Sequence, residues 1–211
     1  METEIAGLLA FITKAEKLKT QVRHSWLSDS KRQESVAEHS WMLGLIAMSI
    51  FDSLDTKVDQ LKVLKMVILH DLAEAITGDI PTFEKSERQT NKYENEKVAF
   101  KEITKDLPPN IAQEFMGIWL EMEQNTTAEA KLAQCLDKVE VWIQHIIADI
   151  KTWDEGDYEV GIYHKDEYFD FHPFLREFKD QVIKQFWTKM EHENKLDAVK
   201  PAELKRYKQT R

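Results

Sequence analysis

Residues 35–51 read SVAEHSWMLGLIAMSIF, a polar start followed by a long apolar run. Ser35 and Glu38 have the Ser-x-x-Glu spacing of a capping box, in which the two residues bond each other's backbone N–H groups at the start of a helix. We therefore expect a helix to begin at Ser35 and to continue through the apolar run. This prediction places His39 in the first turn of that helix.

The same helical periodicity continues along most of the chain. Apolar residues recur at three- and four-residue steps, and alternating runs typical of strands are missing. The sequence therefore predicts an all-α fold, a single-domain helical bundle over residues 1–211. The other expected helices cover about 3–19 (with Ile5, Leu8, Leu9, Ile12 and Ala15 buried), 59–76, 87–105 on the surface, 110–123, 126–153 (opened by Thr126 and Glu129) and 168–190. We expect 154–165 to be a loop and the tail after Lys195 to be solvated.

The composition narrows the class of protein. Asp and Glu number 38 against 29 Lys and Arg, giving a formal net charge of -9, which argues against non-specific binding to nucleic acid or to an anionic membrane. Cys135 is the only cysteine, which suits a reducing compartment. Glu2 and Glu4 stand where a secretory signal would be basic, and no apolar run approaches the roughly 20 residues that cross a bilayer. We expect a cytoplasmic protein.

Two histidines and two aspartates on predicted helices form a candidate metal site. His70 and Asp71 are a weak signal alone, but His39 precedes them at a helix start and Asp137 follows inside a long helix. Two imidazoles and two carboxylates suit a borderline divalent cation and leave coordination positions for water and substrate. Such a cation activates water and polarises a phosphoryl oxygen, so the set predicts hydrolysis of a phosphate ester.

Two further carboxylates follow closely. Glu74 lies four residues after His70, so a helix would turn both to one face, where Glu74 could transfer a proton. Asp79 comes directly after Gly78 and could orient the attacking water or the leaving oxygen. A turn aspartate that only bonds its own backbone is the alternative.

Three segments resemble the motifs of the HD-domain superfamily, and most closely those of its 5'-deoxynucleotidase group. They are Glu34–His39, His70–Pro81 and Asp137-Lys138. The resemblance covers a metal-site core of about residues 8–150, and leaves the C-terminal helix and polar tail, about 166–211, outside it.

The resemblance implies a helical bundle that binds one divalent metal ion (Mn, Co, Mg, Zn, Ni or Fe) and removes phosphate from deoxynucleoside 5'-monophosphates, commonly as a homodimer. It assigns His39, His70, Asp71 and Asp137 as metal ligands, and Glu74 and Asp79 as catalytic support.

The family also uses an arginine and a nearby tryptophan after the first helix, and Arg23 and Trp26 resemble this pair. The arginine fork would hold the phosphate and the indole would shape the sugar site. The intervening residues His24 and Ser25 differ from the family's usual forms. A solvated arginine and a core tryptophan are the alternatives.

Other histidines carry less weight. His145 follows Asp137 by two helical turns and could be a further ligand or base, although a structural histidine is the favoured interpretation. His24, His164 and His172 form no second metal-binding pattern in the sequence, so we expect a mononuclear site. The segment 83–95 is either a lid or a charged surface helix.

Other functions remain open at this point. The same metal could serve hydrolysis of a cyclic nucleotide, a triphosphate or a phosphonate, and the scaffold could be a non-catalytic nucleotide-binding module. An iron oxygenase would need ligands for a second iron that the sequence pattern does not supply.

Overall fold

The helix predicted at residue 35 begins where expected in the computed structural model, which describes residues 2–209. The Ser35 side chain accepts a hydrogen bond from the Glu38 backbone, and the Glu38 carboxylate accepts one from the Ser35 N–H at 2.9 Å. Both halves of the capping box therefore fix the start of α2 (Val36–Ile50), and with it the position of His39.

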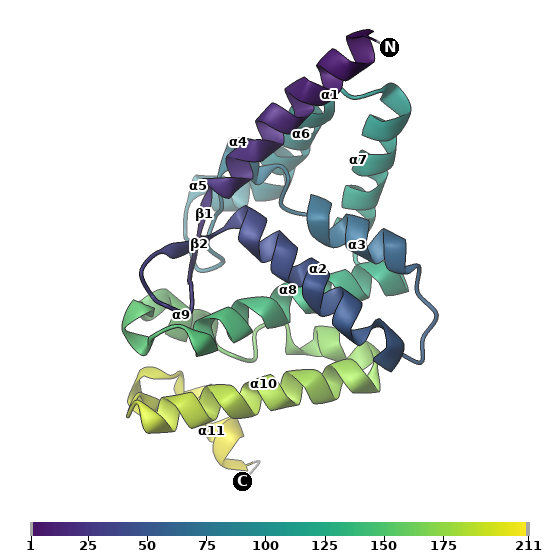
Figure 1. The fold of residues 1–211 in the computed structure, drawn as a ribbon. Coiled ribbons are helices and arrows are strands. Elements are labelled where there is room, and N and C mark those ends of the chain that lie inside the picture. The colour runs from purple at the N-terminus through teal and green to yellow at the C-terminus, as the bar shows by residue number, and fades with distance from the viewer. Residues whose placement is uncertain (1, 210–211) are drawn as a thin grey trace.

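The described residues form an all-α bundle, as predicted, to which one small hairpin is added (Figure 1). Its longer helices are α1 (Glu2–Ala15), α2 (Val36–Ile50), α3 (Gln60–Leu69), α6 (Lys92–Thr104), α7 (Pro109–Gln124), α8 (Ala128–Ile147), α10 (Pro173–His192) and α11 (Pro201–Gln209). Short helices are α4 (Glu74–Thr77), α5 (Glu87–Thr90) and α9 (Glu155–Val160), and the strands are β1 (Val22–Trp26) and β2 (Gln33–Ser35). Short 3-10 helices cover Glu16–Lys19, Phe51–Ser53, Ile150–Thr152, Asp166–Phe171 and Leu196–Ala198.

Helix α8 is the centre of the bundle. Helices α2, α3, α7 and α10 all pack against it, and in Figure 1 it runs between α2 and α10. Its apolar residues Leu132, Leu136 and Val139 are fully buried, so the helix that carries Asp137 packs inside the fold. Among residues 2–209, no helix is long and apolar enough to cross a membrane.

The single helix predicted over 59–76 is wrong, because the chain breaks between α3 and α4. The Trp119 indole N–H donates to the His70 carbonyl at 3.1 Å. The Glu74 N–H, which would bond that carbonyl in a continuous helix, bonds the Asp71 carbonyl instead, and the Leu72 N–H likewise bonds three residues back. The tight turn holds His70 and Asp71 at the end of α3.

The expectation that strands are missing is also wrong. Strands β1 and β2 pair antiparallel, with Val22 opposite Ser35 and Trp26 opposite Gln33. The strands are short, and their polar residues show no apolar alternation. They are held by a tertiary contact, because the Gln144 side-chain amide on α8 donates to the Trp26 carbonyl.

Several element boundaries differ from the predictions. Thr127, not Thr126, caps α8, because its side chain accepts from the Ala130 N–H, and the helix ends at Ile147 instead of Trp153. The predicted loop 154–165 contains α9, the helix expected from Tyr168 begins at Pro173, and the tail contains α11. The expected surface helix 87–105 is split into α5 and α6, and the inner face of α6 is buried through Ala99, Phe100 and Ile103.

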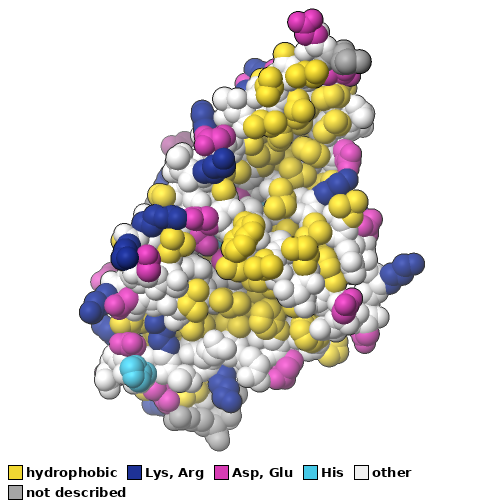
Figure 2. Space-filling view, viewed as in Figure 1, with side chains coloured by type: hydrophobic (Ala, Val, Ile, Leu, Met, Phe, Trp, Pro, Cys, Tyr) yellow, Lys and Arg dark blue, Asp and Glu magenta, His cyan; other side chains and the backbone are white. Residues whose placement is uncertain are grey.

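The predicted buried face of α1 is largely exposed in this chain. Ile5, Leu8, Leu9 and Ile12 are exposed by 54%, 47%, 59% and 51%. Helix α1 packs on α6 and on its own following turn, Glu16–Lys19. The apolar stripe of α1 therefore has no cover among the described residues (Figure 2).

Candidate metal centre and substrate pocket

The structure brings together the four residues proposed from the sequence as metal ligands. His39 comes from α2, His70 and Asp71 from the turn after α3, and Asp137 from α8. The Asp71 Oδ2 atom lies 3.0 Å from His70 Nε2 and 3.9 Å from His39 Nε2, and Asp137 Oδ1 lies 3.3 Å from His39 Nε2. These separations are close to those between neighbouring ligands of one ion with bonds of about 2.1 Å.

The orientation of the imidazoles fits a metal ion. The Nε2 atoms of His39 and His70 are buried and have no hydrogen-bond partner among the described residues. Their Nδ1 atoms are engaged: His39 Nδ1 lies 2.6 Å from a Glu140 oxygen, and His70 Nδ1 lies 3.0 Å from the Val67 carbonyl. Metal-binding histidines are typically held in this way by a carboxylate or carbonyl behind them. The cluster is therefore compatible with a divalent metal site.

A pocket of about 890 Å³, including its open mouth, lies beside this cluster. Asp71 and Asp137 form part of its wall. Its other polar lining residues are Arg23, His24, Ser25, Glu74, Asp79, Thr82, Lys92, Lys138, His145, Asp157 and His164, and its aromatic ones are Phe83 and Trp142. The pocket carries charges of both signs, five carboxylates beside the cations Arg23, Lys92 and Lys138. Although the chain is acidic overall, these three cations can attract an anionic substrate locally.

Arg23 is a buried cation within this pocket, not a solvated one. One guanidinium nitrogen lies 3.0 Å from Asp71 Oδ2 and 3.6 Å from Asp79 Oδ1, and its Nε lies 3.8 Å from Glu34. Burial by itself lowers the pKa of Arg23, but Asp71 and Asp79 outweigh it and raise the pKa above its ordinary value. Arg23 therefore stays charged at the wall of the pocket.

Glu74 and Asp79 are the pocket carboxylates whose pKa values are raised. Burial is the main cause for both, and the nearby charge of Asp71 adds to it. One Glu74 oxygen is buried without a hydrogen-bond partner, and the other lies 3.6 Å from Lys92 Nζ. Glu74 is therefore suited to hold a proton that it can release into the pocket. Asp79 faces Arg23 across the pocket wall, which gives it a partner other than its own turn.

The Trp26 side chain does not line this pocket. Trp26 is half-buried at the end of β1.

The sequence interpretation also missed Glu140, which lies three residues after Asp137. That spacing puts both carboxylates on one face of the helix, and it is the sequence signal from which Glu140 could have been predicted to lie near the metal site. Lys92 had no such signal, because α6 is separate from every motif.

The pH dependence of stability should report on Glu96, which lies 3.4 Å from Lys92. Burial raises the pKa of Glu96 to about 7, although Lys92 opposes the shift. The folded chain therefore holds this proton more tightly than the unfolded chain, and ionising Glu96 lowers stability as pH rises from about 4.5 towards 7. We expect Glu96→Gln to gain up to about 3 kcal/mol over the wild type across this range, measured by urea unfolding at each pH. A constant difference between the two proteins would contradict this.

These features define a helical bundle whose histidine and aspartate cluster, compatible with a metal site, lies at the edge of a pocket lined by charges of both signs. The HD domain family model matches residues 15–198, and the chain therefore belongs to the HD domain family.

Individual relatives agree with this membership. The chain is 32% identical over 139 residues to the 5'-deoxynucleotidase HDDC2 of Homo sapiens, a match covering 65% of this chain and 66% of that protein. It is 28% identical over 190 residues to the 5'-deoxynucleotidase hdd1 of Schizosaccharomyces pombe, covering 86% and 93%. Among solved structures, a predicted metal-dependent phosphohydrolase from Magnetospirillum magnetotacticum MS-1 superposes with a TM-score of 0.77 at 25% identity, covering 95% of this chain and 97% of that one.

Proposed function

We propose that this protein is a metal-dependent phosphohydrolase that hydrolyses deoxynucleoside 5'-monophosphates to deoxynucleoside and phosphate. The observation that carries the proposal is the convergence of the unpartnered His39 and His70 Nε2 atoms with Asp71 and Asp137 beside the buried cation Arg23. The relatives that are named 5'-deoxynucleotidases support the substrate class. His39, His70, Asp71 and Asp137 are the proposed ligands.

The chain's own residues divide the work of the reaction. When bound, the divalent cation supplies Lewis-acid chemistry, polarising a phosphoryl oxygen and lowering the pKa of water. Arg23 binds the phosphate through its planar fork, which suits phosphate oxygens better than a lysine does. Asp79, 3.6 Å from Arg23, fixes that fork and orients the attacking water. Glu140 positions the His39 ring from behind.

Glu74 supplies the proton for the leaving group. Its raised pKa means that the carboxyl can hold a proton in the folded chain before the reaction. We assign it to protonate the 5'-oxygen as the bond to phosphorus breaks, which leaves a neutral nucleoside hydroxyl. Lys92, 3.6 Å away, then stabilises the ionised carboxylate.

The nucleoside occupies the aromatic end of the pocket. Phe83 and Trp142 line it and offer apolar faces to a sugar and base. Phe83 lies in the segment 83–95, so this segment contributes directly to the proposed substrate site. Trp26 remains a proposed sugar-site residue, acting through the position of β1, which also carries Arg23.

The test is phosphate release from a panel of deoxyribo- and ribonucleoside 5'-monophosphates. The protein is stripped with a chelator, and Mn²⁺, Co²⁺, Mg²⁺, Zn²⁺, Ni²⁺ or Fe²⁺ is restored one at a time. We expect release only with metal, and faster release from deoxyribonucleotides. Release from cyclic nucleotides or triphosphates alone would favour another phosphoesterase. Thermal stabilisation by a nucleotide without turnover would favour a binding module.

We also propose that the protein is a homodimer, and the exposed apolar side chains support this. The stripe on α1 continues over α2 and α3, where Trp41 is exposed by 62%, Leu45 by 42%, Met48 by 58%, Leu61 by 62% and Ile68 by 51%. Figure 2 shows hydrophobic side chains gathered over α1 and α2 on one face. A contiguous apolar face of this kind is typical of a protein interface. A cytoplasmic location of the protein is a separate proposal, which rests on the sequence.

The oligomeric state is predicted to depend on Leu9. A charge at its place would be buried without a partner in the interface, so Leu9→Glu should shift the wild-type dimer to a monomer in light scattering at micromolar concentration. Leu9→Met keeps an apolar side chain of similar volume and should remain dimeric. A dimer that persists in Leu9→Glu would place the interface elsewhere.

A further inference from the structure

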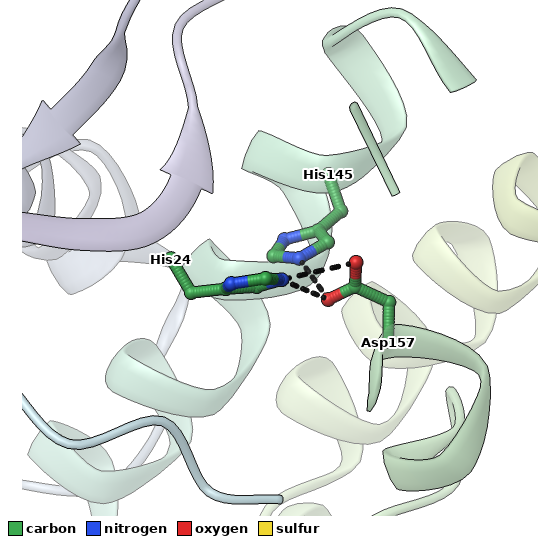
Figure 3. A group of neighbouring side chains, drawn as sticks. All are labelled: His24, His145 and Asp157. Atoms are coloured by element: carbon green, nitrogen blue, oxygen red, sulfur yellow. Dashed lines mark hydrogen bonds and ion pairs between the residues drawn. The ribbon is translucent and has the colours of Figure 1, made fainter. Parts of the chain in front are cut away.

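A second group of metal-ligating side chains lies in the same pocket, apart from the four residues assigned above. His24 comes from β1, His145 from α8 and Asp157 from α9, and their polar atoms point at one another (Figure 3). The Asp157 Oδ1 atom lies 2.8 Å from His145 Nε2 and 3.1 Å from His24 Nε2. His145 and Asp157 are buried, and all three residues line the pocket wall.

The hydrogen bonding of His145 points to a ligand. Its Nδ1 lies 2.8 Å from the Val141 carbonyl, which can only accept, so Nδ1 carries a hydrogen. In the neutral ring, Nε2 then carries a lone pair, and this lone pair faces the carboxylate of Asp157 at 2.8 Å. Two acceptors this close require a cation, either a second proton on the ring or a metal ion shared by both atoms.

The three side chains are held in place before any ligand binds. The Asp154 N–H donates to Asp157 Oδ2 at 2.9 Å within the capping box of α9, which fixes the carboxylate. The His24 ring packs edge-on against Phe83, with ring centres 4.9 Å apart. The Trp153 indole donates to the His145 carbonyl at 3.1 Å, which ties the end of α8 to the next turn. The site is therefore preorganised.

The separations match the geometry of a metal site. For bonds of about 2.1 Å, neighbouring ligands of a tetrahedral or octahedral ion are roughly 3.0 to 3.4 Å apart. Of the two histidine-to-aspartate distances, 3.1 Å lies within this range and 2.8 Å just below it. Two histidines and one carboxylate on one side of an ion are a known set for zinc and for non-haem iron, with the remaining positions open.

We propose that His24, His145 and Asp157 bind a second divalent transition-metal ion, whose open coordination positions face the pocket. The ion takes water or an oxygen atom of the substrate there. The expected single metal of the sequence interpretation then becomes two separate sites, and the structural role favoured for His145 becomes that of a ligand. The proposal does not depend on which phosphate ester the protein hydrolyses.

Metal stoichiometry tests this directly, without any measurement of activity. Metal-free protein is titrated with Zn²⁺ alone by calorimetry, and bound zinc is then measured by elemental analysis after gel filtration. We expect two equivalents per chain in the wild type and one in His24→Gln. His24 caps no helix, so this change spares the fold. His192→Gln, which removes an exposed histidine, should retain two equivalents.

The assignment of each equivalent uses a second variant. Asp71→Ala should lose the other equivalent, and Asp71→Ala combined with His24→Gln should lose both. One equivalent in the wild type that persists in His24→Gln would mean that the cluster is a proton-bridged group without metal, and would overturn the proposal. Two equivalents in His24→Gln would overturn it as well. Both results would leave the proposed hydrolase function intact.

Discussion

The Asp71→Ala variant is expected to release phosphate at least about 10³-fold more slowly than the wild type. Asp71 is the residue on which the site converges: its Oδ2 lies 3.0 Å from both His70 and the Arg23 guanidinium. Removing it deletes a proposed metal ligand and releases Arg23 from its main partner. A loss of about 4 kcal/mol in transition-state stabilisation is of the size expected when metal and phosphate positioning fail together.

The measurement is the initial rate of phosphate release at saturating metal, with bound metal determined on the same samples. Asp52→Ala is the matched control, because Asp52 is an exposed aspartate outside the pocket. It should keep the wild-type rate and metal content. Circular dichroism establishes that both variants are folded. Undiminished release from folded Asp71→Ala would remove the metal cluster from the proposed mechanism.

The positions of His39 and Asp137 could be predicted because local signals place both of them. The capping box at Ser35 determines where α2 begins, and therefore at which turn of the helix His39 lies. The apolar periodicity of α8 determines which face of that helix is buried, although Asp137 itself lies at the edge of that face and opens to the pocket. Signals of this kind act within one helix, so one sequence is enough to read them.

The break after α3 could not be predicted, because its cause is distant in the sequence. The Trp119 donor to the His70 carbonyl is 49 positions away. Without that contact, nothing in residues 59–76 distinguishes one helix from two. The second histidine cluster is hidden for the same reason, since His24 and Asp157 are 133 positions apart and meet only when β1 and α9 pack beside α8.

The α1 stripe shows another limit of a periodicity argument. The spacing of Ile5, Leu8, Leu9 and Ile12 correctly identifies an apolar helix face. Periodicity does not say whether that face covers the chain's own core or another molecule. In the structure these four side chains are about half exposed, so the pattern recorded an exposed apolar surface of the kind typical of interfaces.

Arg23→Ala is expected to raise the KM for the nucleotide by about 100-fold, with a smaller fall in kcat. A charge-assisted, bidentate contact to phosphate contributes about 1.5 to 3 kcal/mol, which corresponds to roughly 10- to 150-fold in binding. Inorganic phosphate, a product of the proposed reaction, should inhibit the variant correspondingly less. Arg23→Lys keeps the charge but loses the fork, and should lie between the two.

Two measurements separate phosphate binding from a structural role of Arg23. Its guanidinium also balances Asp71 and Asp79, so a purely structural role would lower thermal stability and metal content in Arg23→Ala while leaving inhibition by phosphate unchanged. Phosphate binding predicts the reverse: weaker inhibition in a variant that retains its metal. Arg88→Ala, which removes an exposed arginine paired with Glu84, should alter neither. Because Arg23 is the most buried of the cations that the pocket offers, weakened phosphate inhibition here would fix the end of the pocket at which the phosphate binds.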